Sequence, residues 1–109
     1  MIKATFYQTE DGALLKGFVV KGHSFSAEAG RDVICAFVSS AAILTANTVT
    51  DVIHAKAKAE ESDGYLKLIV DDFHNESVQN TLDGFYLHMK ELSKMYPQYL
   101  KIIRIITEV

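Results

Sequence analysis

Hydrophobic and polar residues alternate at the start of this chain, and this alternation predicts a β-strand with one buried face. Ile2, Ala4 and Phe6 occupy every second position, with more polar residues between them. Residues 10–12 (EDG) then provide a turn, and residues 14–21 (LLKGFVVK) provide a returning strand. The first part of the chain is therefore expected to form a β-hairpin.

A second alternation, in residues 54–60 (HAKAKAE), places alanine at every second position. Alanine, lysine and glutamate favour helices, but the period of two favours a strand. The turn-forming residues 62–64 (SDG) and the apolar residues 65–70 (YLKLIV) follow. We give the period more weight than the composition and expect a second hairpin. Residues 99–107 (YLKIIRIIT) are expected to form a closing strand.

A long helix is predicted between the two hairpins, because residues 31–53 contain neither glycine nor proline. From Val33 onward this helix is apolar on nearly every side, whereas a helix with one face in water shows a polar stripe. We therefore expect a second cover besides the sheet, either the other helix or a partner chain. Residues 39–42 (SSAA) are small enough to allow close approach, which favours a homodimer.

A second helix is expected to begin at Asn75, a suitable N-cap residue, and to end before Pro97. Its apolar residues recur at spacings of three and four and form one stripe: Val78, Leu82, Phe85, Met89, Leu92 and Tyr96. The predicted order is ββαββαβ. It describes a single two-layer α+β domain over residues 1–109, with a mainly antiparallel sheet and two helices.

Composition narrows the classes of function. A chain of 109 residues with 49% hydrophobic and 23% charged residues is typical of one folded domain. The net charge of −3 argues against direct nucleic-acid binding through a basic face. Neither a signal peptide nor an uninterrupted apolar segment of membrane-spanning length is evident, so we expect a cytoplasmic protein with no membrane partner. The one cysteine cannot form an intramolecular disulfide, which agrees with a reducing compartment.

Candidate chemistry is concentrated between Gly22 and Ser39. Cys35, the only cysteine, is predicted in the first turn of the long helix, and His23 follows the preceding strand. The helix N-terminus and a nearby imidazole both promote formation of the reactive thiolate. The same N–H groups can hold the oxyanion of an acyl-transfer intermediate, and Asp32 is the expected N-cap. Spacing alone does not show that the thiol and the imidazole meet.

Simpler interpretations exist for each of these residues. Cys35 is also explained as a small buried hydrophobe, and Asp32 as an ordinary helix cap. Gly22 and Gly30 are also explained by turns or by close backbone approach. Ser39 lies one helical turn beyond Cys35, but a serine within a helix usually bonds its own backbone. No two histidines have a metal-ligand spacing, and no cofactor motif is present, so neither a metal nor a cofactor is expected.

Residues 22–23 (GH) and 30–39 (GRDVICAFVS) together resemble the signature of the ribosomal-processing cysteine protease (Prp) family. The likeness extends to residues 1–6 (MIKATF), 63–66 (DGYL) and 96–99 (YPQY). It implies a homodimeric cysteine endopeptidase that removes a short N-terminal extension from a large-subunit ribosomal protein, after paired phenylalanines.

The resemblance also implies roles for individual residues. His23 and Cys35 are the implied catalytic dyad, and Asp32 and Ser39 are implied to line the site. Two features depart from the family pattern. Phe37 stands at a position where the family often has alanine, and the loop residues Ser24, Phe25 and Ser26 differ from the family's common loop sequence. These differences affect the expected substrate groove rather than the dyad.

In the expected mechanism, the extension binds beside residues 24–30, Cys35 attacks the scissile carbonyl, and His23 transfers the proton. The main alternative is a dimeric module without catalytic activity that binds ribosomal proteins or assembly intermediates, with Cys35 serving as packing. A thiol redox sensor is a weaker third option, because the chain has no second cysteine to resolve an oxidised thiol.

Overall fold

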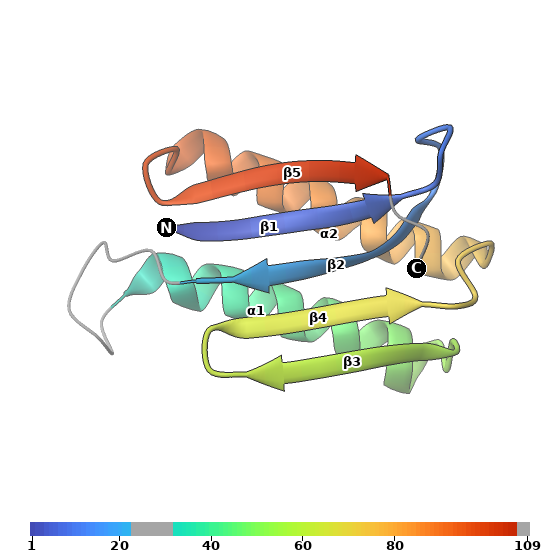
Figure 1. The fold of residues 1–109 in the computed structure, drawn as a ribbon. Coiled ribbons are helices and arrows are strands. Elements are labelled where there is room, and N and C mark those ends of the chain that lie inside the picture. Colours follow the sequence, from blue (N-terminus) through green and yellow to red (C-terminus); the bar gives the residue numbers. More distant parts are fainter. Residues whose placement is uncertain (23–31, 107–109) are drawn as a thin grey trace.

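The protein forms two layers, a five-stranded sheet and a pair of helices that covers one of its faces (Figure 1). The computed structural model describes residues 1–22 and 32–106. The elements in chain order are β1 (Ile2–Gln8), β2 (Leu15–Lys21), α1 (Val33–Asn47), η1 (Thr48–Val52), β3 (Ala57–Ser62), β4 (Tyr65–Val70), α2 (Glu76–Met95) and β5 (Leu100–Ile106). The predicted α+β class and the order ββαββαβ are confirmed.

The strand order in the sheet is β3-β4-β2-β1-β5. Three of its pairings, β1 with β2, β2 with β4 and β3 with β4, are antiparallel. The pairing of β1 with β5 is parallel. The two hairpins explain the antiparallel neighbours, and α2 carries the chain back so that β5 runs in the same direction as β1. The prediction of a mainly antiparallel sheet is therefore confirmed.

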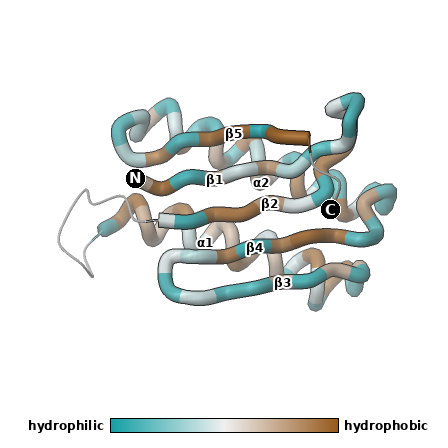
Figure 2. The backbone as a smooth tube through the Cα atoms, in the orientation of Figure 1, coloured by the Kyte–Doolittle hydropathy of each residue, from teal (hydrophilic) through white to brown (hydrophobic). Residues whose placement is uncertain are grey.

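The second hairpin follows the alternation of residues 54–60 rather than their helix propensity. Ala57 and Ala59 of β3 lie opposite Val70 and Leu68 of β4, on the side of the sheet that faces the helices. In Figure 2, β3 is mostly hydrophilic, as expected for an edge strand with little buried area. Gly64 closes the hairpin with φ of +66°, a conformation that glycine adopts without steric cost.

The hydrophobic core lies between the sheet and the two helices. Phe6, Phe18 and Phe85 are central to it, and the rings of Phe18 and Phe85 have centroids 4.6 Å apart. Gln79 of α2 is a buried polar residue that joins this helix to the first hairpin. Its amide nitrogen donates to the carbonyl of Leu15, and its carbonyl accepts from the N–H of Leu15. The two layers are thus held by apolar packing and by one polar bridge.

The long helix changes its winding near its end. The α-helical part stops at Asn47, and residues 48–52 continue as a π-helical turn. Here Thr48 and Thr50 donate their hydroxyls to carbonyls four residues earlier, which loosens a helix locally. The helix was expected to run to about residue 53, so its length is confirmed while the π-turn was not foreseen.

The outer side of α1 is only partly covered. Phe37, Leu44 and Val52 are 43%, 68% and 72% exposed, although α2 lies beside α1 in the same layer. Between the two helices runs an apolar groove of about 1040 Å³, whose wall includes Phe37, Leu44 and Met95. We name it the α1–α2 groove. The second helix therefore supplies only part of the cover that the sequence led us to expect.

The segment Val33–Val52 is long and apolar enough, by length and hydropathy, to cross a bilayer. Polar residues interrupt this segment, so it agrees with the expectation that the sequence has no uninterrupted apolar run of membrane-spanning length. Its inner side belongs to the folded domain, because Ile34, Val38 and Ala42 are buried in the core shared with the sheet. About a third of the segment is buried in this way, whereas Phe37, Leu44 and Val52 on its outer side are exposed.

Candidate active site

The N-terminal turn of α1 fixes the position of Cys35. Asp32 precedes the helix with extended backbone angles, and its Oδ1 atom accepts hydrogen bonds from the N–H groups of Ile34 at 3.0 Å and Cys35 at 3.1 Å. These two groups are among the donors that a helix leaves unpaired at its start. The prediction that Asp32 is the N-cap of this helix is confirmed.

The second oxygen of the same carboxylate contacts the thiol itself. Cys35 Sγ donates to Asp32 Oδ2 at 3.1 Å. The side chain of Cys35 is half-buried and packs against the edge of the core, so it is neither a fully buried hydrophobe nor a freely exposed thiol. Asp32 therefore has two contacts with Cys35, one through the backbone and one through sulfur.

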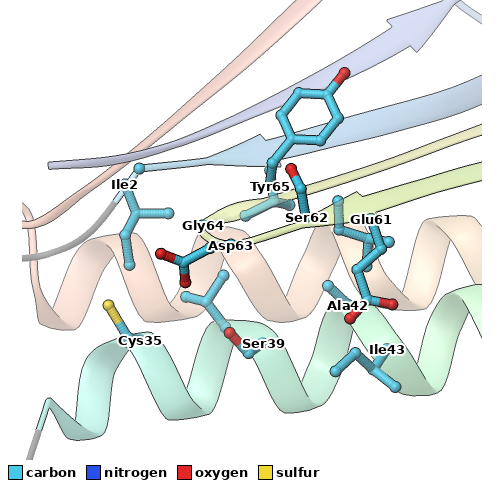
Figure 3. Close-up of a pocket in the computed structure, with 14 residues that line it drawn as sticks. Ile2, Cys35, Ser39, Ala42, Ile43, Glu61, Ser62, Asp63, Gly64 and Tyr65 are labelled. Atoms are coloured by element: carbon cyan, nitrogen blue, oxygen red, sulfur yellow. The ribbon is translucent and has the colours of Figure 1, made fainter. Parts of the chain in front are cut away.

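Cys35 opens onto a pocket of about 180 Å³ formed by three separate segments. The start of α1 contributes Cys35 and Ser39, the end of β2 contributes Gly22, and the β3–β4 turn contributes Asp63 and its neighbours. Figure 3 shows the thiol rising from α1 below Ile2, while the carboxylate of Asp63 points from the turn toward the same helix. The thiol is therefore accessible from a concave surface.

Gly22 closes the pocket at the end of β2. Its φ is +99°, and a Cβ atom at this position would lie 2.4 Å from the backbone oxygen of Met1. Its N–H donates to the carbonyl of Gly64 at 2.9 Å, which ties β2 to the β3–β4 turn. The suggested need for positive φ and close backbone approach is thus met at Gly22.

Ser39 lies one turn after Cys35 and faces the same pocket. It is exposed, and within residues 1–22 and 32–106 its hydroxyl makes no hydrogen bond, so it does not bond its own helix as helical serines often do. Its hydroxyl is therefore one of the polar groups that line the pocket.

The β3–β4 turn adds residues that the sequence did not single out as site residues. Glu61, Asp63 and Tyr65 line the pocket, and both carboxylates are on exposed residues. The turn itself was predicted from residues 62–64. Its proximity to Cys35 depends on β4 lying beside β2, a pairing that no short-range sequence signal specifies.

Five of the residues proposed from the sequence, His23, Ser24, Phe25, Ser26 and Gly30, lie outside the described residues. Their roles therefore remain predictions. In the part of the chain that the structure describes, no group of three or more His, Cys, Asp or Glu side chains is arranged to hold a metal ion. The site contains a thiol, a hydroxyl and several carboxylates, which is a set suited to nucleophilic chemistry.

The sequence model of the family described as cysteine protease Prp matches residues 1–101. A search of curated proteins finds no significant match. Among solved structures, the fold is similar to that of the essential ribosomal processing protease Prp of S. aureus in complex with a covalently linked product peptide. The TM-score is 0.89 at 18% identity, covering 96% of this chain and 100% of that one.

Two further crystal structures have the same fold. The S. aureus protease in complex with a substrate peptide gives a TM-score of 0.84 at 17% identity, over 96% of this chain and 100% of that one. The protein SMU.848 of Streptococcus mutans gives 0.77 at 25% identity, over 98% and 96%. The structural matches support the fold, and the family match extends over nearly the whole sequence. The chain therefore belongs to the Prp family of cysteine proteases.

Proposed function

We propose that this cysteine protease removes a short N-terminal extension from a large-subunit ribosomal protein, cutting after paired phenylalanines. The observation that carries the proposal is the position of Cys35, whose thiol opens from a helix N-terminus onto a pocket between two hairpins. The S. aureus protein of the same fold is described as a ribosomal processing protease. That activity supports the choice of substrate class proposed for this chain.

In the proposed reaction, Cys35 Sγ attacks the scissile carbonyl while His23 accepts the thiol proton. The C–N bond of the tetrahedral intermediate then breaks, and His23 returns the proton to the leaving amine. Water subsequently hydrolyses the thioester. Residues 24–30, including Ser24, Phe25 and Ser26, lie beside the bound extension in this proposal, and Ser39 hydrogen-bonds the peptide.

The Asp32 cap adds a requirement to this mechanism. Its Oδ1 atom accepts from the N–H groups of Ile34 and Cys35, the same donors that an oxyanion near Sγ would need. For these donors to act, the carboxylate must release them. A thiolate beside a carboxylate places two negative charges within hydrogen-bond distance, and their repulsion favours that release. Thiol deprotonation and exposure of the oxyanion donors are thus coupled through Asp32.

We further propose that the protein acts as a homodimer in the cytoplasm, with the α1–α2 groove covered by the second copy. The groove contains exposed apolar side chains, among them Leu44 at 68% and Met95 at 64% exposure. Burying side chains of this size stabilises an association by about 1.5–3 kcal/mol each before the cost of binding is subtracted. Small residues at Ser40, Ala41 and Gly84 allow the backbones to approach.

The cleavage position tests the proposed function. The ribosomal protein from the organism that encodes this chain, with its N-terminal extension, is incubated with wild-type protein or with Cys35→Ser. The masses of the products are then measured by mass spectrometry. A single cut directly after paired phenylalanines, seen only with wild type, supports the proposal. A cut at another position would contradict the proposed specificity, although the protein would still be a protease. An uncut substrate would favour the alternative, a dimeric module that binds ribosomal proteins without cleaving them.

A further inference from the structure

The face of the sheet turned away from the helices carries a row of lysines. We call it the open face, and Figure 1 is viewed from this side, with the helices behind the strands. On it, Lys3 of β1 lies opposite Lys21 of β2 and also opposite Lys101 of β5. All three residues are exposed. Neighbouring strands are about 5 Å apart, so three ammonium groups extend from adjacent strands in one line.

The charge of the open face differs in sign from the charge of the whole chain. The outward positions of the five strands hold Lys3, Lys21, Lys58, Lys67 and Lys101. The one acidic residue at these outward positions is Glu60, which lies opposite Lys67. Glu61 points to the other side of the sheet, where it lines the pocket beside Cys35. Five lysines and one glutamate give this face a charge of +4, on a chain whose net charge is −3.

Among residues 1–22 and 32–106, no carboxylate forms an ion pair with Lys3, Lys21 or Lys101, and Lys94 with Glu91 of α2 is the one ion pair found there. Like charges directly opposite each other on adjacent strands destabilise a sheet. Lys3 has such a neighbour on both sides, so the arrangement lowers the stability of the free protein. A bound anion that spans the strands would offset this repulsion.

Two tyrosines share the open face with the lysines. Tyr65 lies opposite Lys21, and Tyr7 lies farther along β1. The Nζ atom of Lys67 is 6.0 Å from the centroid of the Tyr7 ring, so cationic and aromatic side chains are interleaved. Both tyrosines are partly exposed. Their rings can stack on planar groups of a ligand while the ammonium groups contact its charges.

We propose that the open face binds single-stranded nucleic acid. Lysines in a line contact successive phosphates of the backbone, and tyrosines between them stack on bases, as on other sheet surfaces that bind single strands. An acidic protein segment would also match the charge, but it would give the two tyrosines no flat partners. The net charge of the chain argued against nucleic-acid binding, because it sums the positive open face with the acidic residues of the turns and helices.

The open face and the pocket beside Cys35 meet at one end of the sheet. Lys21 directly precedes Gly22, and Tyr65 belongs to both the open face and the pocket wall. Single strands bound along the lysine row would therefore end near the pocket. The proposal itself does not depend on the proposed peptidase specificity, since it follows from strand register and charge.

Binding is measured by fluorescence anisotropy of a labelled oligouridine of about a dozen nucleotides, with the deoxy strand of equal length as a second probe. The variant Lys3→Gln/Lys21→Gln is compared with Lys90→Gln/Lys94→Gln, which loses the same charge from α2. We expect the first pair to weaken binding roughly tenfold at 0.1 M salt and to lower the slope of log K against log salt by about 1.4. The α2 pair is expected to stay within about twofold of wild type.

Base stacking is tested separately with Tyr65→Leu, which should weaken binding while leaving the salt slope unchanged. Circular dichroism verifies that each variant is folded, and relief of like-charge repulsion should keep the lysine variant at least as stable as wild type. Three results would overturn the proposal: no binding of either strand by wild type, equal losses in the two lysine variants, or equally strong displacement of the probe by polyglutamate.

Discussion

Asp32 and Cys35 are joined twice: Oδ1 of Asp32 accepts from the Cys35 N–H, and Oδ2 accepts from the Cys35 thiol at 3.1 Å. One carboxylate therefore caps the helix and holds the proposed nucleophile. The pair is the point at which local helix formation and chemistry depend on each other, and substitutions of Asp32 can separate the two contributions.

Asp32→Asn keeps a good N-cap residue but removes the negative charge beside sulfur. Alkylation of Cys35 by iodoacetamide verifies that the thiol stays accessible in this variant. Peptide cleavage should become slower, because the neutral amide is not repelled and keeps the N–H groups of Ile34 and Cys35 occupied. A variant that cleaves peptide as fast as wild type would contradict the coupling described above.

Asp32→Ala removes the cap as well as the charge. We expect the free energy of unfolding to fall by about 1 kcal/mol relative to wild type, as is typical for loss of an N-cap. Urea denaturation of wild type, Asp32→Asn and Asp32→Ala provides the comparison. Equal stability of the alanine and asparagine variants would mean that the cap contributes nothing measurable.

Gly22→Ala tests the close approach at the end of β2. The added methyl group would meet the backbone oxygen of Met1, and φ of +99° is unfavourable for alanine. We expect a loss of about 1–3 kcal/mol in unfolding free energy, together with weaker closure of the pocket against Gly64. Gly84→Ala is the matched control when both changes are made in Leu44→Glu, which is expected to be monomeric, because within one chain the methyl group it adds to α2 has no atom within 4 Å. That change should raise stability by up to about 1 kcal/mol.

Leu44→Glu tests the proposed dimer through the α1–α2 groove. Leu44 is 68% exposed and lines the groove, whereas Leu87 is 60% exposed and lies outside it. A carboxylate at the centre of an apolar interface is costly, so Leu44→Glu should be monomeric while Leu87→Glu keeps the wild-type mass in sedimentation equilibrium. Wild-type protein that is monomeric at micromolar concentration would remove the dimer proposal altogether.

The elements of the fold follow from local patterns that the sequence displays. The turn at residues 62–64, the Asn75 cap and the stop before Pro97 each rest on neighbouring residues, and all three are present. The alternation around Ala57 also prevailed over helix propensity. Each of these features is encoded within a few residues, which is why inspection of the sequence finds it.

The arrangement of the site depends on contacts between distant segments. Asp63 reaches the Cys35 pocket only because β4 pairs with β2 rather than with β1, and because α1 crosses below that turn. The lysine row likewise requires β1 between β2 and β5. Hydrophobic patterning specifies which side of a strand is buried, but it does not specify which strand lies beside it.

Turnover of a fluorogenic peptide with a Phe-Phe-Ala junction, compared between wild type and Cys35→Ser, tests the central claim most directly. The account predicts cleavage by wild type and none by the serine variant, because a serine hydroxyl at this helix N-terminus is a far weaker nucleophile than the thiolate. Equal turnover by both proteins would contradict the assignment of Cys35 as the nucleophile.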